Sequence, residues 1–263
     1  MSIVDSDYLA AAREAGQLHE LDAFRYVAGS YVEPVTDEKQ CFVEFADGGL
    51  LTEPGLGRLT ARLTDDFPQA QRLLLRAPAE VSLPAPWAPQ LTYVFYQGTP
   101  GSPDPAVVPA RPQDRDLLID WLMRAFADAG SAFGGPGAEE GLRRLAEDVL
   151  AGPGRQSIVY LVGDAAVGHA TLLCDASDTV TGEHFVELLD ILVEPDHDVR
   201  AITRELVTVA ALRAQELGKR LVGNVVHAVD GGGNGDRVVA ALEKSGWAVA
   251  FRYWQRGARQ EEG

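Results

Sequence analysis

The sequence lacks several features that define common classes of protein. It has two cysteines, Cys41 and Cys174, which lie in different halves of the chain within strand-like segments. Two isolated cysteines exclude a disulfide framework and a zinc-finger spacing. No run of eighteen apolar residues occurs, and the first residues lack a basic stretch followed by an apolar one. We therefore expect a cytoplasmic protein with no membrane association and no metal.

Lysine is also scarce, and the chain is strongly acidic. Lys39, Lys219 and Lys244 are the lysines among the 23 basic residues, against 39 acidic ones, for a formal net charge of −16. A broad phosphate-binding face is therefore not expected, and neither is a nucleic-acid partner. The same charge favours the approach of a cationic small substrate, although an acidic surface more commonly serves solubility.

The length and the loop composition indicate two domains. At 263 residues the chain exceeds the size of a typical single domain. Proline and glycine interrupt every periodic pattern over residues 97–114. We place a boundary near residue 105, which gives an N-terminal α/β domain over 1–105 and a second domain over 106–263.

The N-terminal domain contains no motif that specifies chemistry. Periodicity and residue content predict one or two helices over 8–29 and helical segments over 56–67 and 69–75. Residues 40–47 and 92–97 are rich in β-branched and aromatic residues and are expected to form strands. Such a domain suits a lid on the substrate side or a dimerisation surface, so a homodimer is compatible with it.

The second domain shows a more regular order of elements, ending in a long helix, a strand, a helix and a strand. The patterns predict strand, helix, helix, three strands, helix, strand, helix and strand over residues 106–110, 115–129, 139–151, 157–164, 166–175, 185–193, 199–219, 221–229, 236–246 and 247–255. Gly218 and Gly246 are expected to end the last two helices.

This order, together with four short stretches, resembles the GNAT acetyltransferase superfamily across about residues 106–256. The stretches are VVPARPQDRDLLIDWL, VYLVGDAAVGHATL, LLDILVEP and LEKSGW. The resemblance implies a mixed α/β fold (α+β mixed sheet), with the GNAT-like acyltransferase fold at the C-terminus and, at the N-terminus, an α/β domain that faintly echoes a degenerate second copy. It also implies transfer of an acyl group from acetyl-CoA or another acyl-CoA to an amine, by direct attack.

The resemblance further implies where the acyl carrier binds. The implied contacts are Ile191, Leu192, Val193, Arg200, Ala201, Ile202, Thr203 and Asn234. Family members usually carry a glycine-rich loop before the long helix, whose backbone N–H groups hold the pyrophosphate. Here the loop has no glycine and begins with Asp198, which repels phosphate. The helix start and the side chains of Arg200 and Thr203 are the expected compensation.

Two carboxylates, Glu187 and Asp190, lie on the apolar strand before that helix, where a charged group is costly unless it is used or paired. Glu187 stands eight residues before Pro195, which matches the position of a general-base glutamate in several family members. An apolar strand would raise its pKa toward neutral. Strand alternation predicts that Asp190 faces the opposite side. We expect Asp190 either to contact substrate or to have a structural role.

A histidine on the next strand is a second candidate for proton transfer. His227 follows Asn224 by three residues and titrates near neutral pH. The alternative is a histidine that hydrogen-bonds loop backbone at the strand end. Many family members also carry a tyrosine that protonates the leaving thiolate, but Leu242 occupies that position here. Tyr253 is a possible substitute, or a residue packed in the sheet.

The leading hypothesis is therefore an N-acyltransferase that acts on a primary amine of a small molecule, with Glu187 as the base. A second hypothesis keeps the transfer but takes the acyl group from acyl carrier protein or aminoacyl-tRNA, the one case that would involve nucleic acid. A third is a non-catalytic binding protein that retains the fold, since fold alone does not fix function.

Overall fold

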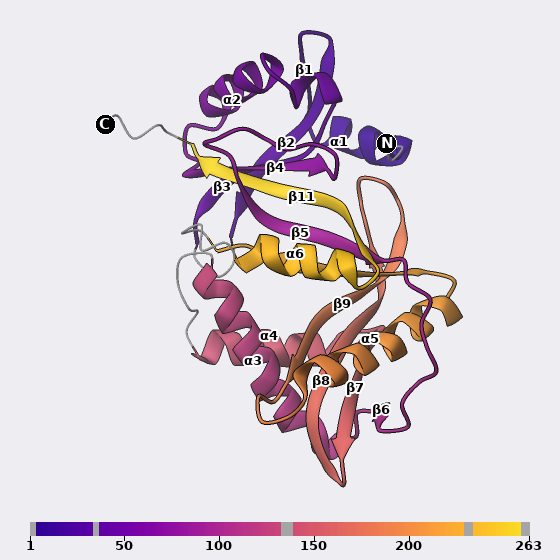
Figure 1. Ribbon diagram of the computed structural model, residues 1–263. Helices are drawn as coiled ribbons and strands as arrows, with labels where there is room; N and C mark the ends of the chain where they lie inside the picture. Colours follow the sequence, from indigo (N-terminus) through magenta and orange to yellow (C-terminus); the bar gives the residue numbers. More distant parts are fainter. Residues whose placement is uncertain (1–3, 34–36, 133–138, 229–233, 259–263) are drawn as a thin grey trace.

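The computed structural model describes residues 4–33, 37–132, 139–228 and 234–258 and shows one 11-stranded mixed sheet flanked by helices (Figure 1). The strands are β1 (Leu18–Leu21), β2 (Phe24–Val32), β3 (Lys39–Ala46), β4 (Arg72–Pro78), β5 (Ala88–Tyr96), β6 (Val107–Pro109), β7 (Arg155–Val162), β8 (Ala165–Ser177), β9 (His184–Val193), β10 (Arg220–Val226) and β11 (Trp247–Gly257). The helices are α1 (Ser6–Glu14), α2 (Gly55–Asp66), α3 (Arg115–Ala132), α4 (Glu139–Ala151), α5 (Val199–Glu216) and α6 (Asn234–Lys244).

The order of elements predicted for the second domain is confirmed, but two predictions for the first domain are wrong. Over residues 8–29 only α1 is helical, because Asp22 and Ala23 adopt positive φ angles of 51° and 65° and turn the chain into the β1–β2 hairpin. Such a two-residue turn matches the twist of antiparallel strands.

Residues 69–75, expected to be helical, lead into strand β4. This strand lies between β3, with which it runs parallel, and β11. Leu73 and Leu75 are fully buried. Leu74 between them is also buried, so both faces of the strand are covered. A strand buried on both faces shows a continuous apolar run rather than alternation, and such a run is not distinguishable from a buried helix by periodicity alone.

Two strands are exchanged between the N-terminal and C-terminal parts of the sheet. The spatial order is β1-β2-β3-β4-β11-β5-β10-β9-β8-β7-β6, so β5 lies against β10 while β11 lies against β4. Figure 1 shows yellow β11 among the strands of the N-terminal part. The sheet is therefore continuous across the boundary that we place near residue 105, and the division into two domains stays a prediction.

The two parts of the sheet repeat one arrangement. Strand β3, helix α2 and parallel strand β4 correspond to strand β9, helix α5 and parallel strand β10. The other strand pairs of the described sheet are antiparallel. This repetition supports the weak sequence echo of a second copy in the first 105 residues.

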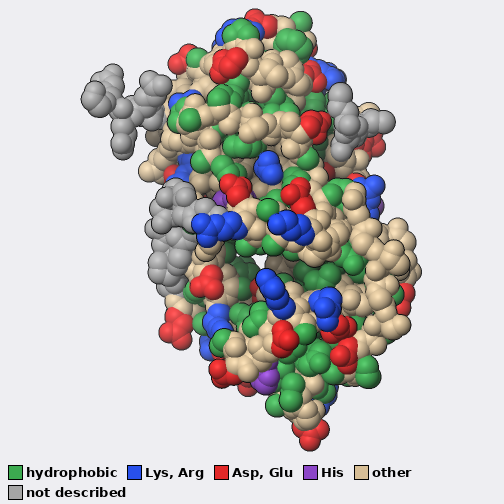
Figure 2. All heavy atoms as spheres, viewed as in Figure 1, with side chains coloured by type: hydrophobic (Ala, Val, Ile, Leu, Met, Phe, Trp, Pro, Cys, Tyr) green, Lys and Arg blue, Asp and Glu red, His purple; other side chains and the backbone are tan. Residues whose placement is uncertain are grey.

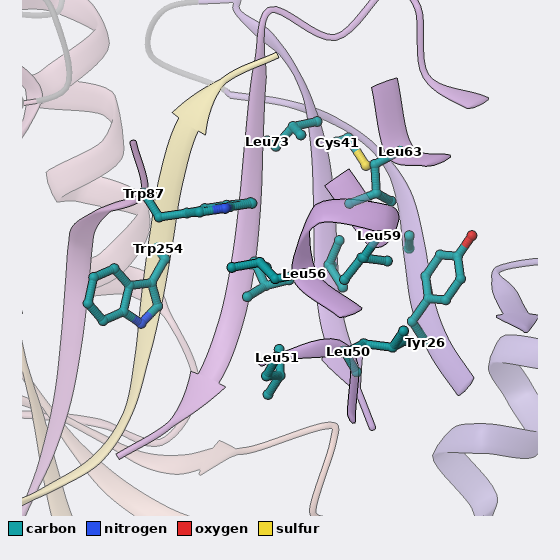
Figure 3. Packing of buried hydrophobic residues seen from close by; sticks show 14 of the residues in the cluster. Tyr26, Cys41, Leu50, Leu51, Leu56, Leu59, Leu63, Leu73, Trp87 and Trp254 are labelled. Carbon is teal, nitrogen blue, oxygen red and sulfur yellow. The ribbon is translucent and has the colours of Figure 1, made fainter. Parts of the chain in front are cut away.

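Helices cover both faces of the sheet. On one face lie α2, α5 and α6, where Leu56, Leu59 and Leu63 of α2 pack with Leu73 and Trp254 (Figure 3). Helix α5 packs on β8, β9 and β10 of the same face, and α6 on β10 and β11. Helices α3 and α4 cover β7, β8 and β9 on the opposite face. In the described part of the chain, no helix combines the length and apolar character needed to cross a membrane.

Candidate functional site

Strand β9 carries the predicted base, Glu187, on the face opposite helix α5. Its neighbours Val186 and Leu188 belong to the core under α5, so Glu187 points to the other side of the sheet. Burial raises the pKa of Glu187, and a hydrogen bond from the Asn224 side chain on β10 partly opposes that rise. A partly buried carboxyl group with a raised pKa and one polar partner has the properties expected of a general base.

Asp190 lies on the same face as Glu187, and the prediction that it faces the opposite side is wrong. Strand β8 pairs Leu173 with Glu187 and Leu172 with Leu188, but Thr171 pairs with Asp190. Leu189 is therefore an extra residue, a β-bulge that reverses the alternation. Because of this bulge, both carboxylates of β9 face the side covered by α3.

Asp190 has a buried histidine as its neighbour. Its Oδ2 lies 3.0 Å from Nε2 of His169, which is completely buried, although neither atom makes a hydrogen bond of acceptable geometry within the described chain. Trp121 of α3 stacks on the His169 ring with centroids 5.0 Å apart and planes within 6°. The indole Nε1 of Trp121 donates to Glu194, 2.5 Å away. These contacts hold α3 against the end of β9.

An aromatic row continues the face of Glu187 toward the N-terminal part of the sheet. Tyr93 of β5 is opposite Asn224 of β10 in register, and it stacks on Phe251 of β11 with centroids 4.6 Å apart. Tyr253 meets Tyr93 edge-on at 5.9 Å. Burial raises the pKa of Tyr253 to about 12 and also raises that of Tyr93, so both phenols stay protonated at neutral pH.

The row ends at a partly buried ion pair. Arg76 of β4 lies 3.8 Å above the Phe251 ring and donates to both carboxylate oxygens of Asp178, at 2.7 and 2.6 Å. The two side chains are only 10% and 12% exposed. Burial works to raise the pKa of Asp178, but the hydrogen bonds and charge of Arg76, with the Thr181 hydroxyl, hold it below its ordinary value.

A cavity of about 860 Å³ opens on this face. Its walls include Phe185 of β9 and Val222 of β10, which is the register partner of Glu187. Glu187 therefore borders the cavity without lining it. Its far wall includes Glu44 and Arg76, so the cavity reaches from the β9–β10 pair across β5 and β11 to β3 and β4.

Strands β9 and β10 separate just beyond Glu187, and this opening contains the predicted carrier contacts on β9. Their parallel pairing ends at Leu188 and Gly223. The Glu194 N–H donates to the carbonyl of Val167 on β8. Backbone groups alternate along a strand, so those of Leu192 also point to β8, whereas those of Ile191 and Val193 point to the opposite edge of β9, where β10 has separated. An extended ligand can pair with such an edge as an added strand would. The Ile191 and Val193 side chains pack in the core under α5.

The start of helix α5 is already capped by the chain itself. The Asp198 carboxylate accepts from the Ala201 N–H at 3.0 Å, and the N–H groups of Val199 and Ile202 bond to the carbonyls of His197 and Asp198. Three of the first four helical N–H groups are thus used. A pyrophosphate does not find the usual set of backbone donors here.

Side chains are the remaining source of phosphate contacts. Arg200 of α5 and Arg237 of α6 are exposed, whereas Ile202 packs in the core. Thr203 is half-buried, and Asn234 is exposed at the first position of α6. Figure 2 shows a hollow just below helix α6 with Lys and Arg side chains on both sides of it. The local positive charge contrasts with the acidic total.

His227 lies on the face of the sheet opposite Glu187. Its Nε2 is 2.8 Å from the hydroxyl of Thr92, the neighbour of Tyr93 on β5, and its Nδ1 is 3.8 Å from Asp236 of α6. Burial lowers the pKa of His227, with Asp236 working in the opposite sense, so the ring is neutral at physiological pH. The structure does not bring His227 and Glu187 together. Leu242 packs in the core under α5 and α6.

Sequence reasoning did not identify Tyr93, Phe251 or Arg76 as site residues. They lie on β4, β5 and β11, which meet only through the strand exchange. One signal was present, because β5 and β11 each carry aromatic residues at alternate positions.

Comparisons with known proteins place the fold. No protein-family model and no curated protein matches the sequence. Among solved structures, a GNAT-family acetyltransferase from Colwellia psychrerythraea is 11% identical, with a TM-score of 0.54 over 97% of each chain. A putative GNAT-family acetyltransferase from Novosphingobium aromaticivorans is 15% identical, with a TM-score of 0.43 over 98% of each chain. The first of these covers the N-terminal residues as well as 106–256.

Proposed function

We propose that this chain, which has the fold of the GNAT acetyltransferases, is an N-acyltransferase that moves an acyl group from acyl-CoA to a primary amine of a small molecule. The observation that carries the proposal is the position of Glu187. It is a partly buried carboxyl group with a raised pKa, beside both a cavity and the open edge of β9. A likeness of fold alone would not support an activity.

Glu187 would accept the proton that the acceptor must lose. An ammonium has no lone pair, so the amine attacks only after deprotonation. Acyl-CoA supplies an activated thioester carbonyl. The amine nitrogen forms the new C–N bond, the C–S bond breaks, and the sulfur leaves as a thiolate. The nitrogen loses a second proton as the amide forms, and that proton goes to the departed thiolate or to solvent. The first proton ends on Glu187, directly or through one water, and Asn224 keeps the carboxylate oriented by its hydrogen bond.

The thiolate would leave without a dedicated acid at the usual position, since Leu242 is apolar and packed in the core. A thiol is acidic enough for its thiolate to be a fair leaving group. Tyr93 and Tyr253 face the same side as Glu187, but burial raises both pKa values and makes them poor proton donors. Asp190 is brought to this face by the bulge, and because its Oδ2 lies against His169, it would contact the acceptor through its other oxygen.

The open edge of β9 suits the pantetheine arm of the carrier, with Ile191 and Val193 offering backbone groups. The capped start of α5 does not suit a pyrophosphate, so the phosphates would depend on Arg200 and on Arg237. The capped start of α5 also favours a second candidate for the acyl donor. A donor such as acyl carrier protein or aminoacyl-tRNA presents its phosphates differently and does not need the missing loop.

Isothermal titration calorimetry with acetyl-CoA, longer acyl-CoAs and free CoA tests the donor. We expect binding of at least one acyl-CoA that weakens in Arg200→Gln and is unchanged in the control Arg143→Gln, a change on α4 under the other face. Absence of binding to every CoA species at millimolar concentration would contradict an acyl-CoA donor. Transfer from an acylated carrier protein under the same conditions would then support the second candidate.

A further inference from the structure

The cavity beside Glu187 is much longer than an acetyl-accepting amine requires. It is lined by residues from six adjacent strands, β9, β10, β5, β11, β4 and β3. Five strand spacings correspond to roughly 24 Å across a flat sheet. A small amine bound beside Glu187 would leave most of this space empty. The shape therefore suits an elongated ligand that crosses the sheet.

The central strands β5 and β11 contribute apolar side chains to the cavity, namely Phe95, Val249, Ala250 and Phe251. The apolar side chains that line it come from α1, from the loops beside β3 and β4 and from the central strands, and include Leu9, Leu51, Val81, Phe95, Phe185, Val222, Val249 and Phe251. Burying apolar ligand surface against such a wall contributes about 25 cal/mol per Å². The central part of the ligand is therefore expected to be a hydrocarbon chain or another apolar group.

Carboxylates outnumber arginines among the charged side chains that line the cavity. Arg25 and Arg220 pair with Asp47 and Glu183 at 3.4 and 3.3 Å, and Arg76 pairs with Asp178. Each guanidinium that lines the cavity thus has its own carboxylate. An anionic ligand would have to displace one of these partners, which disfavours phosphate or carboxylate groups.

Two further carboxylates line the cavity, and the described residues provide no ion pair for either of them. Glu80 is exposed, whereas Glu44 is half-buried at the end farthest from Glu187. The Tyr8 hydroxyl donates to one oxygen of Glu44 at 2.9 Å and leaves the other oxygen available. Glu44 is close enough to Tyr253 to affect its pKa. A half-buried carboxylate with an oxygen available is a favourable site for an ammonium group.

We propose that this cavity holds the acceptor, and that the acceptor is an elongated amine with an apolar middle and a second cationic group. Its reacting amine extends to Glu187 at the border of the cavity, and the second cation contacts Glu44. This inference rests on the proposed transfer to an amine, and it specifies which amines are used.

Binding of two probes in the absence of any acyl donor tests the cavity directly. The probes are diaminodecane, with an amine at each end, and decylamine, with one. The wild-type protein should bind the diamine about fivefold more tightly, the ratio expected for one additional ion pair. Glu44→Gln, which keeps an acceptor for Tyr8, should remove this preference and leave decylamine binding unchanged. Glu243→Gln, an exposed change on α6, is the matched control.

Equal affinities of the wild type for the two probes would overturn the inference, as would an equal loss of both in Glu44→Gln. Turnover with acetyl-CoA separates this inference from the function itself. Equal kcat/KM for the two amines would leave the transferase standing and refute the second cation site. A Glu44-dependent preference without transfer from any donor would keep the cation-binding cavity and refute the acyltransferase.

Discussion

Replacing Glu187 by glutamine is expected to lower activity and raise stability together. The amide has nearly the shape of the carboxyl group and can still bond to Asn224, so the change removes proton acceptance with little loss of packing. A positioned general base contributes on the order of 10²–10⁴ in rate. We therefore expect turnover to fall by about a hundredfold or more.

The sign of the stability change follows from the pKa of Glu187. Burial raises this pKa in the folded protein above its value in the unfolded chain. The stability that the group contributes is therefore fully present below the unfolded pKa and is lost as the pH rises through the folded pKa. At neutral pH the charged form disfavours folding, so Glu187→Gln should raise Tm by on the order of 2 °C. The gain should disappear at acid pH.

Steady-state kinetics and thermal unfolding, measured on the same samples between pH 5 and pH 8, provide the assay. In the wild type, kcat/KM should fall as the pH decreases through the raised pKa of Glu187, at a higher pH than for an exposed glutamate. Normal turnover of Glu187→Gln would refute its role as the base. A lower Tm at neutral pH would refute the argument that its charge is a cost to the fold.

Three other outcomes follow from the structure. Asp198→Asn keeps a good helix cap for the Ala201 N–H and removes a negative charge near the phosphates, so it should tighten acyl-CoA binding severalfold in calorimetry. Unchanged affinity would mean that the phosphates lie elsewhere. Asp178→Asn should cost about 3 kcal/mol in urea unfolding because it leaves Arg76 buried without its counter-charge, and a loss well below 1 kcal/mol would contradict the buried pair. His227→Gln should keep turnover within about threefold, since the ring is on the opposite face from the base, whereas a hundredfold loss would restore it as a catalytic candidate.

The C-terminal helices and strands could be predicted locally, because their apolar residues recur at helical or strand spacing and a glycine or proline follows several of them. Helix α5 ends at Glu216, two residues before Gly218, and α6 ends at Lys244, two residues before Gly246, as the glycine positions indicated. Strand β9 was recognisable as an apolar segment before a proline. The mixed α/β fold class is confirmed, and the resemblance to GNAT acetyltransferases is confirmed at the level of fold.

The parts that could not be predicted depend on contacts between distant residues. The exchange of β5 and β11 places Tyr93 and Phe251 next to each other, and no local pattern records which strand pairs with which. The bulge is at Leu189, in a largely apolar strand where no glycine marks it, yet it moves Asp190 to the face of Glu187. The cavity arises from the same long-range pairings.

The strand exchange also determines the order in which this protein can fold during synthesis. Strand β11 leaves the ribosome after every other described strand, and both β4 and β5 pair with it. Until then the N-terminal strands have an open edge at β4, which is a template for pairing with other chains. We therefore expect a chain that lacks residues 247–257 to be prone to aggregation.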